Sequence, residues 1–255
     1  MKIVDNILSF GEYYADIRKK DTVYLHHTAG GHRPDWTIDG WKHDRAKTGG
    51  KLAVATAYVI GGISTTDRDA SYDGDVYRAF DEKYWAHHLG LKQQNNRTLN
   101  QRSIAIEICN YGPLVLNKQG KYINYVNREV PASMVATLDE PFRGYKYYHR
   151  YTDKQLQSLR TLLLGISERH DIDIRRGLRE CFQVPFRHSF AFELKDEASK
   201  GSPGLWTHSN VRKDKNDCFP QPELIAAAVA VFVGIDRAIA AEKLNEQEFV
   251  EPEES

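Results

Sequence analysis

The chain has few cysteines, no excess of charge of either sign and no long apolar run. Its 255 residues include only three cysteines, and this small, odd number provides no disulfide framework. The 35 Lys and Arg residues balance the 35 Asp and Glu residues, so no net charge would attract nucleic acid or an anionic membrane surface. We therefore expect free thiols, synthesis in a reducing compartment and no nucleic acid partner.

No stretch of the sequence is long and apolar enough to cross a bilayer as a helix. The most apolar stretch, residues 224–235, has twelve residues before Asp236 and Arg237, whereas a spanning helix needs about 20. The first ten residues also lack the apolar run of about 7 to 15 residues that marks a secretory signal. We expect no integral membrane segment and synthesis without a signal peptide.

The composition is that of a single globular domain, with 41% apolar and 27% charged residues. Apolar patterning predicts strands at residues 22–26, 53–60, 76–80 and 103–109. Helices are expected at residues 34–47, after Thr152, whose pairing with Gln155 suggests a capping box, and from Pro222 to about Lys243. The tyrosine-rich segment 111–148 is expected to form an irregular loop and hairpin. We predict an α/β fold in which helices flank a central mixed β-sheet.

Two segments carry side chains whose donor atoms suit zinc. His26 ends the first expected strand, and the segment 208–217 begins with His208 and ends with Asp217. Zinc binds nitrogen, sulfur and carboxylate donors, and a catalytic site uses three protein ligands and leaves a fourth position for water. The chain therefore contains a candidate set of ligands for metal-assisted amide hydrolysis.

The choice between His26 and His27 depends on the alternation of side chains along a strand. His26 shares a face with Thr22 and Tyr24, whereas His27 points to the side of the apolar residues of the same strand. A lone histidine at a strand end is more often structural, and only the other candidate ligands favour a metal site here. We favour His26.

Glu107 is a candidate acid or base. On the strand 103–109 the residues Ile104, Ile106 and Ile108 share one face, and Glu107 shares the other. A carboxylate buried there without a partner would cost free energy, so the alternative interpretation is a surface salt bridge.

Several short motifs follow one another in a characteristic order. They are His-His-Thr-Ala-Gly at 26–30, Thr-Ala-Tyr-Val-Ile-Gly at 56–61, Asp-Gly at 73–74, His-Leu-Gly at 88–90, Ser-Ile-Ala-Ile-Glu at 103–107, Tyr-Thr-Asp-Lys-Gln at 151–155, Trp-Thr-His at 206–208 and Lys-Asn-Asp at 215–217. In this order and spacing the chain resembles the zinc-dependent N-acetylmuramoyl-L-alanine amidases, which share a fold with peptidoglycan recognition proteins and many phage endolysins. The resemblance implies an amidase domain at residues 1–246 with an insertion at about 111–150, followed by an acidic flexible tail at 247–255.

The resemblance implies that His26, His208 and Asp217 bind a Zn²⁺ cofactor. Cys218 is the alternative third ligand, because thiolate binds zinc well and some family members use cysteine. Lys215 lies two residues before Asp217, which is the spacing of the family, and this favours Asp217.

The same resemblance assigns roles to three further residues. Glu107 would take the proton of the attacking water, since the tyrosine that other members use on the preceding strand is replaced here by Thr56. Lys215 would stabilise the developing oxyanion. His88 would contact the substrate near the metal, with His87 as the alternative.

The implied reaction is hydrolysis of the amide bond between N-acetylmuramic acid and the L-alanine of the peptidoglycan stem peptide, by a monomer. A phage endolysin, made in the bacterial cytoplasm and released to the cell wall by a holin, is the favoured interpretation, because the tyrosine-rich insertion would suit a polymeric wall. The alternatives are a cytoplasmic amidase that recycles muropeptides and a non-catalytic peptidoglycan-binding module. An amidase that also restrains another protein is a further possibility.

Overall fold

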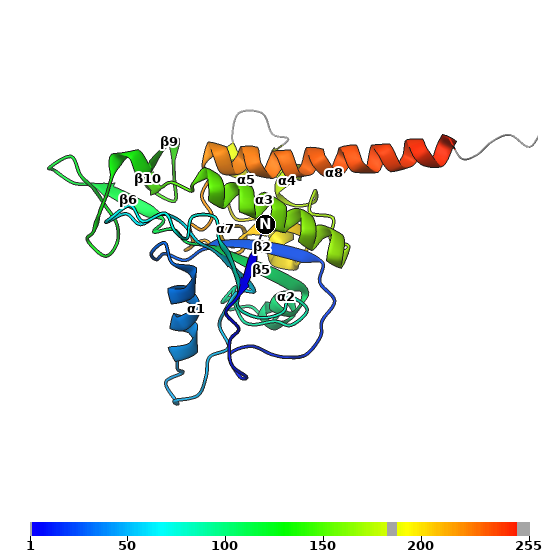
Figure 1. The fold of residues 1–255 in the computed structure, drawn as a ribbon, viewed down its shortest axis with the longest axis horizontal. Coiled ribbons are helices and arrows are strands. Elements are labelled where there is room, and N and C mark those ends of the chain that lie inside the picture. Colours follow the sequence, from blue (N-terminus) through cyan, green and yellow to red (C-terminus); the bar gives the residue numbers. More distant parts are fainter. Residues whose placement is uncertain (1, 183–187, 249–255) are drawn as a thin grey trace, which may run out of the picture.

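The computed structural model describes residues 2–182 and 188–248, which form two β-sheets with helices around the larger one (Figure 1). The larger sheet has the strand order β1-β4-β3-β5-β2-β11. Its strands are β1 (Ile3–Asp5), β2 (Thr22–His27), β3 (Tyr58–Ile60), β4 (Val76–Arg78), β5 (Ser103–Ile108) and β11 (Gly204–Thr207). β3 and β4 run antiparallel, and the other neighbouring strands of this sheet run parallel. The predicted α/β class with a central mixed sheet is confirmed.

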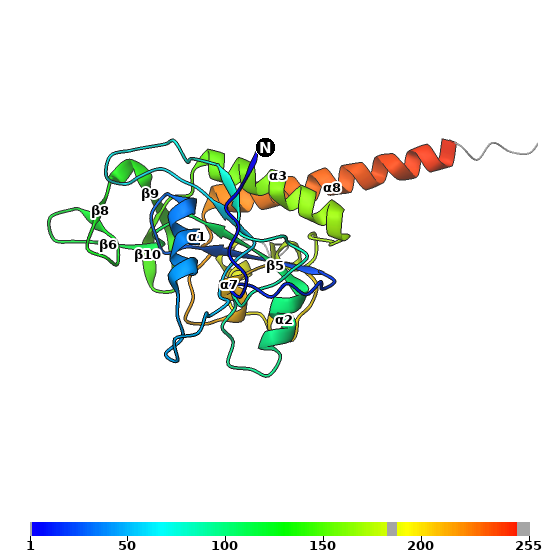
Figure 2. The ribbon, with the colours of Figure 1, turned by 60° about the horizontal axis from the view of Figure 1, so that its bottom comes forward.

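Helices of very different length surround this sheet. They are α1 (Pro34–His43), α2 (Asn96–Arg102), α3 (Asp153–His170), α4 (Leu178–Phe182), α5 (His188–Ala191), α6 (Asp196–Lys200), α7 (His208–Val211) and α8 (Pro222–Glu248). The two longest, α3 and α8, pack against each other on one side of the sheet, and α8 extends past its edge (Figures 1 and 2). α2 lies on the other side. No helix in the described ranges combines the length and apolar character that crossing a bilayer requires.

The helix α3 begins where the sequence predicts it. Thr152 accepts a hydrogen bond from the backbone N–H of Gln155, and the Gln155 side chain accepts one from the backbone N–H of Thr152. This capping box satisfies two donors that the first turn would otherwise leave free. The buried face of α3 consists of leucines and Ile166 at helical spacing, and it contributes to the main core.

The two faces of the central sheet pack against different clusters. Val23 and Leu25 of β2 and the three isoleucines of β5 belong to the large core that includes α3 and α8. Tyr24, on the opposite face of β2, packs with Leu99 of α2 and Trp206 of β11 in a smaller cluster. Because side chains alternate, His26 and Glu107 lie on the face of the smaller cluster.

The second sheet replaces the irregular loop expected at residues 111–148, whereas the expected hairpin is present as its last two strands. Its strands are β6 (Pro113–Leu116), β7 (Tyr122–Ile123), β8 (Glu129–Val130), β9 (Val135–Phe142) and β10 (Tyr145–His149), with a short 3-10 helix at Ala132–Met134. They pair antiparallel in the order β8-β7-β6-β10-β9. Two of the strands have only two residues, and the exposed and buried positions of β9 do not alternate regularly. The pattern that identifies a strand is therefore weak here.

Several element boundaries also differ from expectation. The strand predicted at 53–60 is reduced to β3, because Ala53 adopts a positive φ of 48° and Val54 pairs with His87 instead of joining the sheet. The helix α1 ends at His43, before the predicted 47. The last helix continues to Glu248, so Gln247 and Glu248 of the predicted acidic tail are helical. Residues 249–255 of that tail lie outside the described residues.

Glu82 links the central sheet to the end of α3. Its buried carboxylate accepts hydrogen bonds from the Tyr58 hydroxyl at 2.6 Å, from Arg169 Nε at 2.7 Å and from His170 Nε2 at 2.9 Å. Burial alone would raise the pKa of Glu82, but the hydrogen bonds from His170, Arg169 and Tyr58 hold it at about 2. The folded state therefore favours the ionised carboxylate.

Glu82→Gln is expected to lower the free energy of unfolding by about 1 to 3 kcal/mol at pH 7, after allowance for solvent around the Arg169 side chain. Because folding depresses the pKa, the contribution is complete above the ordinary pKa of a glutamate and is lost as the pH falls toward 2. Urea unfolding at pH 7 and at pH 3 measures both effects. Asp5→Asn, which removes the exposed ion pair with Arg78, is the control and should cost less than about 1 kcal/mol. Equal costs for the two variants would contradict the prediction.

Candidate active site

The carboxyl ends of three parallel strands bring the first candidate residues together. His26 lies near the end of β2, Glu107 near the end of β5, and His208 follows β11 directly. Parallel strands place these ends along one edge of a sheet, which is where α/β proteins commonly bind ligands. His26 and Glu107 are register partners, so their side chains project from the same face.

Asp217 reaches the site because its loop folds back onto α7. The backbone N–H of Ser209 donates to the Asp217 carbonyl at 2.9 Å. Thr207 and Asn210 form a capping box that fixes the start of α7, where His208 is the first residue. The loop therefore holds the Asp217 side chain against the His208 ring.

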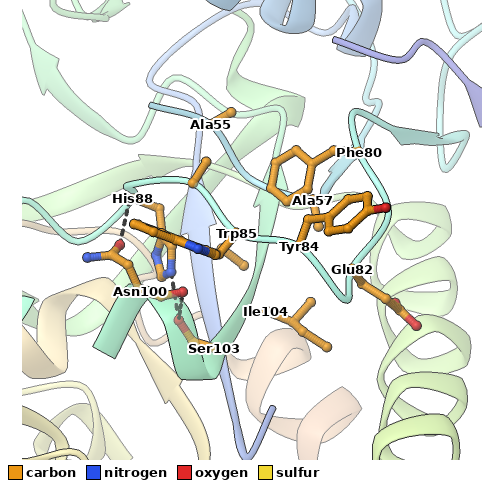
Figure 3. Close-up of a pocket in the computed structure, with 12 residues that line it drawn as sticks. Ala55, Ala57, Phe80, Glu82, Tyr84, Trp85, His88, Asn100, Ser103 and Ile104 are labelled. Atoms are coloured by element: carbon orange, nitrogen blue, oxygen red, sulfur yellow. Dashed lines mark hydrogen bonds between the residues drawn. The ribbon is translucent and has the colours of Figure 1, made fainter. Parts of the chain in front are cut away.

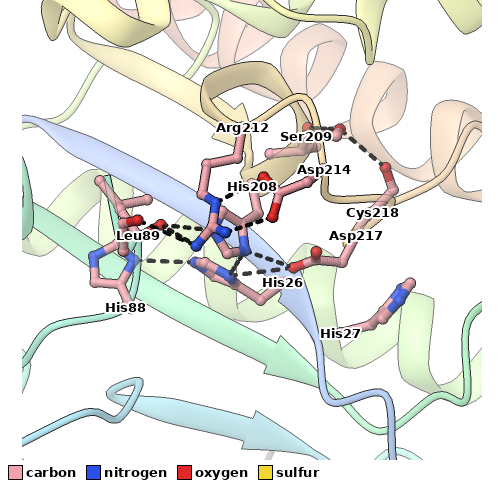
Figure 4. A network of polar contacts seen from close by, with 12 residues as sticks. His26, His27, His88, Leu89, His208, Ser209, Arg212, Asp214, Asp217 and Cys218 are labelled. Atoms are coloured by element: carbon pink, nitrogen blue, oxygen red, sulfur yellow. Dashed lines mark hydrogen bonds and ion pairs between the residues drawn. The ribbon is translucent and has the colours of Figure 1, made fainter. Parts of the chain in front are cut away.

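Three donor atoms converge at this edge (Figure 4). The Nδ1 atoms of His26 and His208 are 3.0 Å apart, and Asp217 Oδ2 lies 3.0 Å from His208 Nδ1 and 3.3 Å from His26 Nδ1. Donors at 2.0 to 2.1 Å from a tetrahedral zinc ion are roughly 3.3 Å from one another. All three side chains are buried. The residues present therefore fit a zinc ion in donor type and in spacing.

The charge states of these groups suit metal binding. Burial, followed by the neighbouring His208, lowers the pKa of His26 to about 4, so the imidazole is neutral near pH 7. Burial would raise the pKa of Asp217, but His208 and His26 hold it well below its usual range. Neutral imidazole and ionised carboxylate are the forms that bind a metal.

The outer nitrogen of His208 has a fixed partner. His208 Nε2 lies 2.9 Å from the Leu89 carbonyl oxygen, which can only accept a hydrogen bond. Nε2 therefore carries the hydrogen, and the lone pair of Nδ1 points toward His26 and Asp217. This contact could not be predicted from the sequence, because a backbone carbonyl has no sequence signature.

Glu107 lies beside the donor cluster, and one of its carboxylate oxygens makes no hydrogen bond within the described residues. This oxygen, Oε2, is buried. Burial, and to a smaller extent the Asp217 carboxylate, raise the pKa of Glu107 to about 8 against the opposing effect of Lys215. A surface salt bridge, the alternative interpretation of this residue, does not match its position.

All six predicted site residues line one cleft of about 330 Å³. Lys215 is half-buried in this cleft, and it lies close enough to affect the pKa of both Glu107 and His26. Both ring nitrogens of His88 have partners, with Nδ1 at 3.0 Å from His26 Nε2 and Nε2 at 2.8 Å from Ser103 Oγ. Thr56, where other family members were expected to carry a tyrosine, also lines the cleft.

The alternative residues lie outside the donor cluster. His27 Nδ1 pairs with the Tyr151 hydroxyl at 3.0 Å, on the other face of β2. Cys218 is fully buried in the main core beside Tyr151, and burial raises the pKa of its thiol well above the usual value. The His87 ring packs edge-on against the rings of Tyr14 and Trp85.

Two residues that the sequence did not single out as site residues connect the second sheet to the site. Tyr125 donates a hydrogen bond to the Ala29 carbonyl, three residues after His26. Arg143, in the turn between β9 and β10, donates to the carbonyls of Ser209 at 3.0 Å and Lys213 at 3.2 Å. The second sheet therefore contacts the loops on two sides of the donor cluster.

Comparison with known proteins identifies the family. Residues 17–218 match the family model of N-acetylmuramoyl-L-alanine amidases. No curated protein matches the chain. Similar solved structures include PlyL, at 12% identity and a TM-score of 0.48 with 91% of this chain and 97% of that chain covered. The catalytic domain of XlyA has 12% identity and a TM-score of 0.47, with 92% and 99% covered. The amidase LysC from Clostridium intestinale URNW has 14% identity and a TM-score of 0.43, with 89% and 96% covered.

The assignment rests on the family model, because it covers most of the chain. Membership supports amidase activity on peptidoglycan. The chain belongs to the N-acetylmuramoyl-L-alanine amidase family.

Proposed function

We propose that this protein is a zinc-dependent hydrolase that cleaves the amide bond between N-acetylmuramic acid and the L-alanine of the stem peptide. The observation that carries the proposal is the convergence of His26, His208 and Asp217 beside the unpartnered carboxylate oxygen of Glu107. A module that only binds peptidoglycan has no use for this buried arrangement, which costs folding free energy.

In this proposal His26, His208 and Asp217 hold the metal through Nδ1, Nδ1 and a carboxylate oxygen. Zinc held there supplies a Lewis acid for the amide carbonyl and makes water a stronger nucleophile near neutral pH.

Glu107 is proposed as the general base and then the general acid. It accepts a proton from the water that attacks the lactyl carbonyl carbon, and it delivers that proton to the L-alanine nitrogen as the C–N bond breaks. Burial raises the pKa of Glu107 to about 8 in the metal-free protein, and a cation held by the neighbouring donors would favour the ionised form that acts as the base.

Lys215 and His88 complete the proposed machinery. The Lys215 ammonium stabilises the negative charge that develops on the carbonyl oxygen during attack. His88 lines the same cleft. In this proposal it contacts the substrate near the metal.

Asp217→Ala is expected to lose zinc, because it removes one of the three converging donors. Cys218→Ala is the matched control at the next position and should retain zinc, since its thiol lies in the core outside the cluster. Elemental analysis of both variants after dialysis measures the difference. Zinc retained by Asp217→Ala and lost by Cys218→Ala would identify the cysteine as the ligand.

Glu107→Gln is expected to retain zinc and to lose about a hundredfold or more of the turnover, because the amide cannot accept the water proton. The assay is mass spectrometry of stem peptide released from purified peptidoglycan by untreated, chelator-treated and zinc-restored protein. Glu168→Gln, on the exposed face of α3, is the control. Full activity of Glu107→Gln would remove this residue from the mechanism, and release of peptide by chelator-treated protein would exclude zinc dependence.

We further propose that the protein acts as a monomeric phage endolysin, made in the bacterial cytoplasm and delivered to the wall through a holin lesion. The amidase domain at residues 1–246 would include the insertion 111–150 as the part that contacts polymeric substrate. The contacts of Tyr125 and Arg143 with loops of the cleft support this role.

Tyr125→Ala is expected to reduce the turnover of polymeric peptidoglycan several times more than that of a soluble muropeptide. The substitution releases the second sheet from the Ala29 carbonyl and leaves the donor cluster in place. Val126→Ala, at the neighbouring exposed position, is the control. A wild-type protein that prefers the soluble fragment would instead support a muropeptide-recycling amidase.

A further inference from the structure

The Ser103 hydroxyl sets the direction of a hydrogen-bond chain behind the cleft. Ser103 Oγ lies 2.8 Å from His88 Nε2 (Figure 3). The same oxygen lies 2.7 Å from the Leu99 carbonyl oxygen. A carbonyl only accepts, so the single hydroxyl hydrogen is donated to Leu99. At His88 the Ser103 oxygen must therefore accept, which places a hydrogen on His88 Nε2.

The direction of hydrogen bonding that Ser103 sets continues through His88 to His26, the first candidate metal ligand. A neutral imidazole carries one N–H, so His88 Nδ1 is an acceptor when Nε2 is protonated. His88 Nδ1 faces His26 Nε2 at 3.0 Å (Figure 4). His26 therefore carries its hydrogen on Nε2, and the lone pair of its Nδ1 points at the donor cluster.

Leu89, the residue after His88, orients the second histidine, His208. The carbonyl of Leu89 accepts a hydrogen bond from His208 Nε2 at 2.9 Å. The side chain of His88 and the backbone of Leu89 thus orient both histidines. In this arrangement two Nδ1 lone pairs and the Asp217 carboxylate face one another with no hydrogen between them, which is favourable around a cation.

Residues 88 and 89 are themselves held by α2. Asn100 is fully buried, and its Oδ1 accepts hydrogen bonds from the backbone N–H of His88 at 2.7 Å and of Leu89 at 3.1 Å. Leu99, whose carbonyl begins the chain of hydrogen bonds, is the preceding residue. The end of α2 therefore positions the backbone, the imidazole and the hydroxyl together.

We propose that His88 is a positioning residue that acts through His26, fixing the tautomer and the ring orientation with which His26 binds zinc, and that Ser103 orients His88 in turn. This inference rests on the proposed zinc site and adds a role that a substrate contact alone does not require. His87, one residue earlier, packs against aromatic rings and has no place in the chain of hydrogen bonds.

Zinc affinity tests the proposal without any measurement of activity. Competition with a chromophoric chelator is measured on folded, zinc-free wild type, His88→Ala, Ser103→Ala, the double variant and His87→Ala. His88→Ala is expected to weaken zinc binding about 10-fold to 100-fold, and Ser103→Ala by less. The double variant should match His88→Ala, because Ser103 acts only through His88. His87→Ala should stay within about threefold of wild type, because its ring lies outside the chain of hydrogen bonds.

The outcomes separate this inference from the proposed function. Wild-type protein that binds no zinc would overturn the zinc site itself. Wild-type binding with unchanged affinity in His88→Ala, or with fully additive effects of His88→Ala and Ser103→Ala, would overturn the positioning role alone. Urea unfolding of the zinc-free variants verifies that each is folded.

Nuclear magnetic resonance gives a second readout, which is measured on proteins that retain His88. In zinc-free protein with ¹⁵N-labelled histidine, ring correlations should show the hydrogen on Nε2 of both His26 and His88. In Ser103→Ala the preference of His88 for this tautomer should be lost. A hydrogen on Nδ1 of either histidine in the wild type would overturn the proposal.

Discussion

The parallel pairing of β2 with β5 is the constraint on which the site depends. It aligns His26 with Glu107, so a proposed metal ligand and a proposed proton acceptor come from neighbouring strands on one face. The opposite face of the same strands carries Val23, Leu25 and three isoleucines, which are buried in the main core. A slip of one residue in either strand would expose this apolar set, so burial of the core holds the register. The chemistry of one face is thereby fixed by the packing of the other.

Buried polar groups are satisfied unevenly around the site. On the outer side His88, Leu89 and Asn100 meet one another and the end of α2 through short hydrogen bonds. On the inner side, the Nδ1 atoms of both histidines face a carboxylate, and one oxygen of Glu107 has no partner in the described ranges. Folded proteins usually satisfy such groups, and departures concentrate where function requires them. The outer hydrogen bonds therefore hold the inner groups in a fixed arrangement.

The parts of the fold and site that follow local rules could be predicted from the sequence. Thr152 and Gln155 specify the start of α3, and alternation along β2 favours His26 over His27, as the structure places them. The second sheet could not be predicted, because its shortest strands have two residues and carry no period. Ser103 and the Leu89 carbonyl were missed for another reason. Their partners are 15 and 119 residues away, and neither contact leaves a pattern in the local sequence.

The second sheet affects the site through backbone atoms. Tyr125 binds the carbonyl of Ala29, and Arg143 binds the carbonyls of Ser209 and Lys213. Contacts to carbonyls do not depend on the side chain at the accepting position, so the residues that accept are free to change while the loops stay anchored. A sheet attached in this way can set the shape of the cleft without contributing a donor atom or a proton acceptor. Through Ser209 and Lys213 the insertion also contacts the segment that carries Lys215 and Asp217, so the proposed preference for polymeric substrate and the proposed zinc chemistry share one anchored loop.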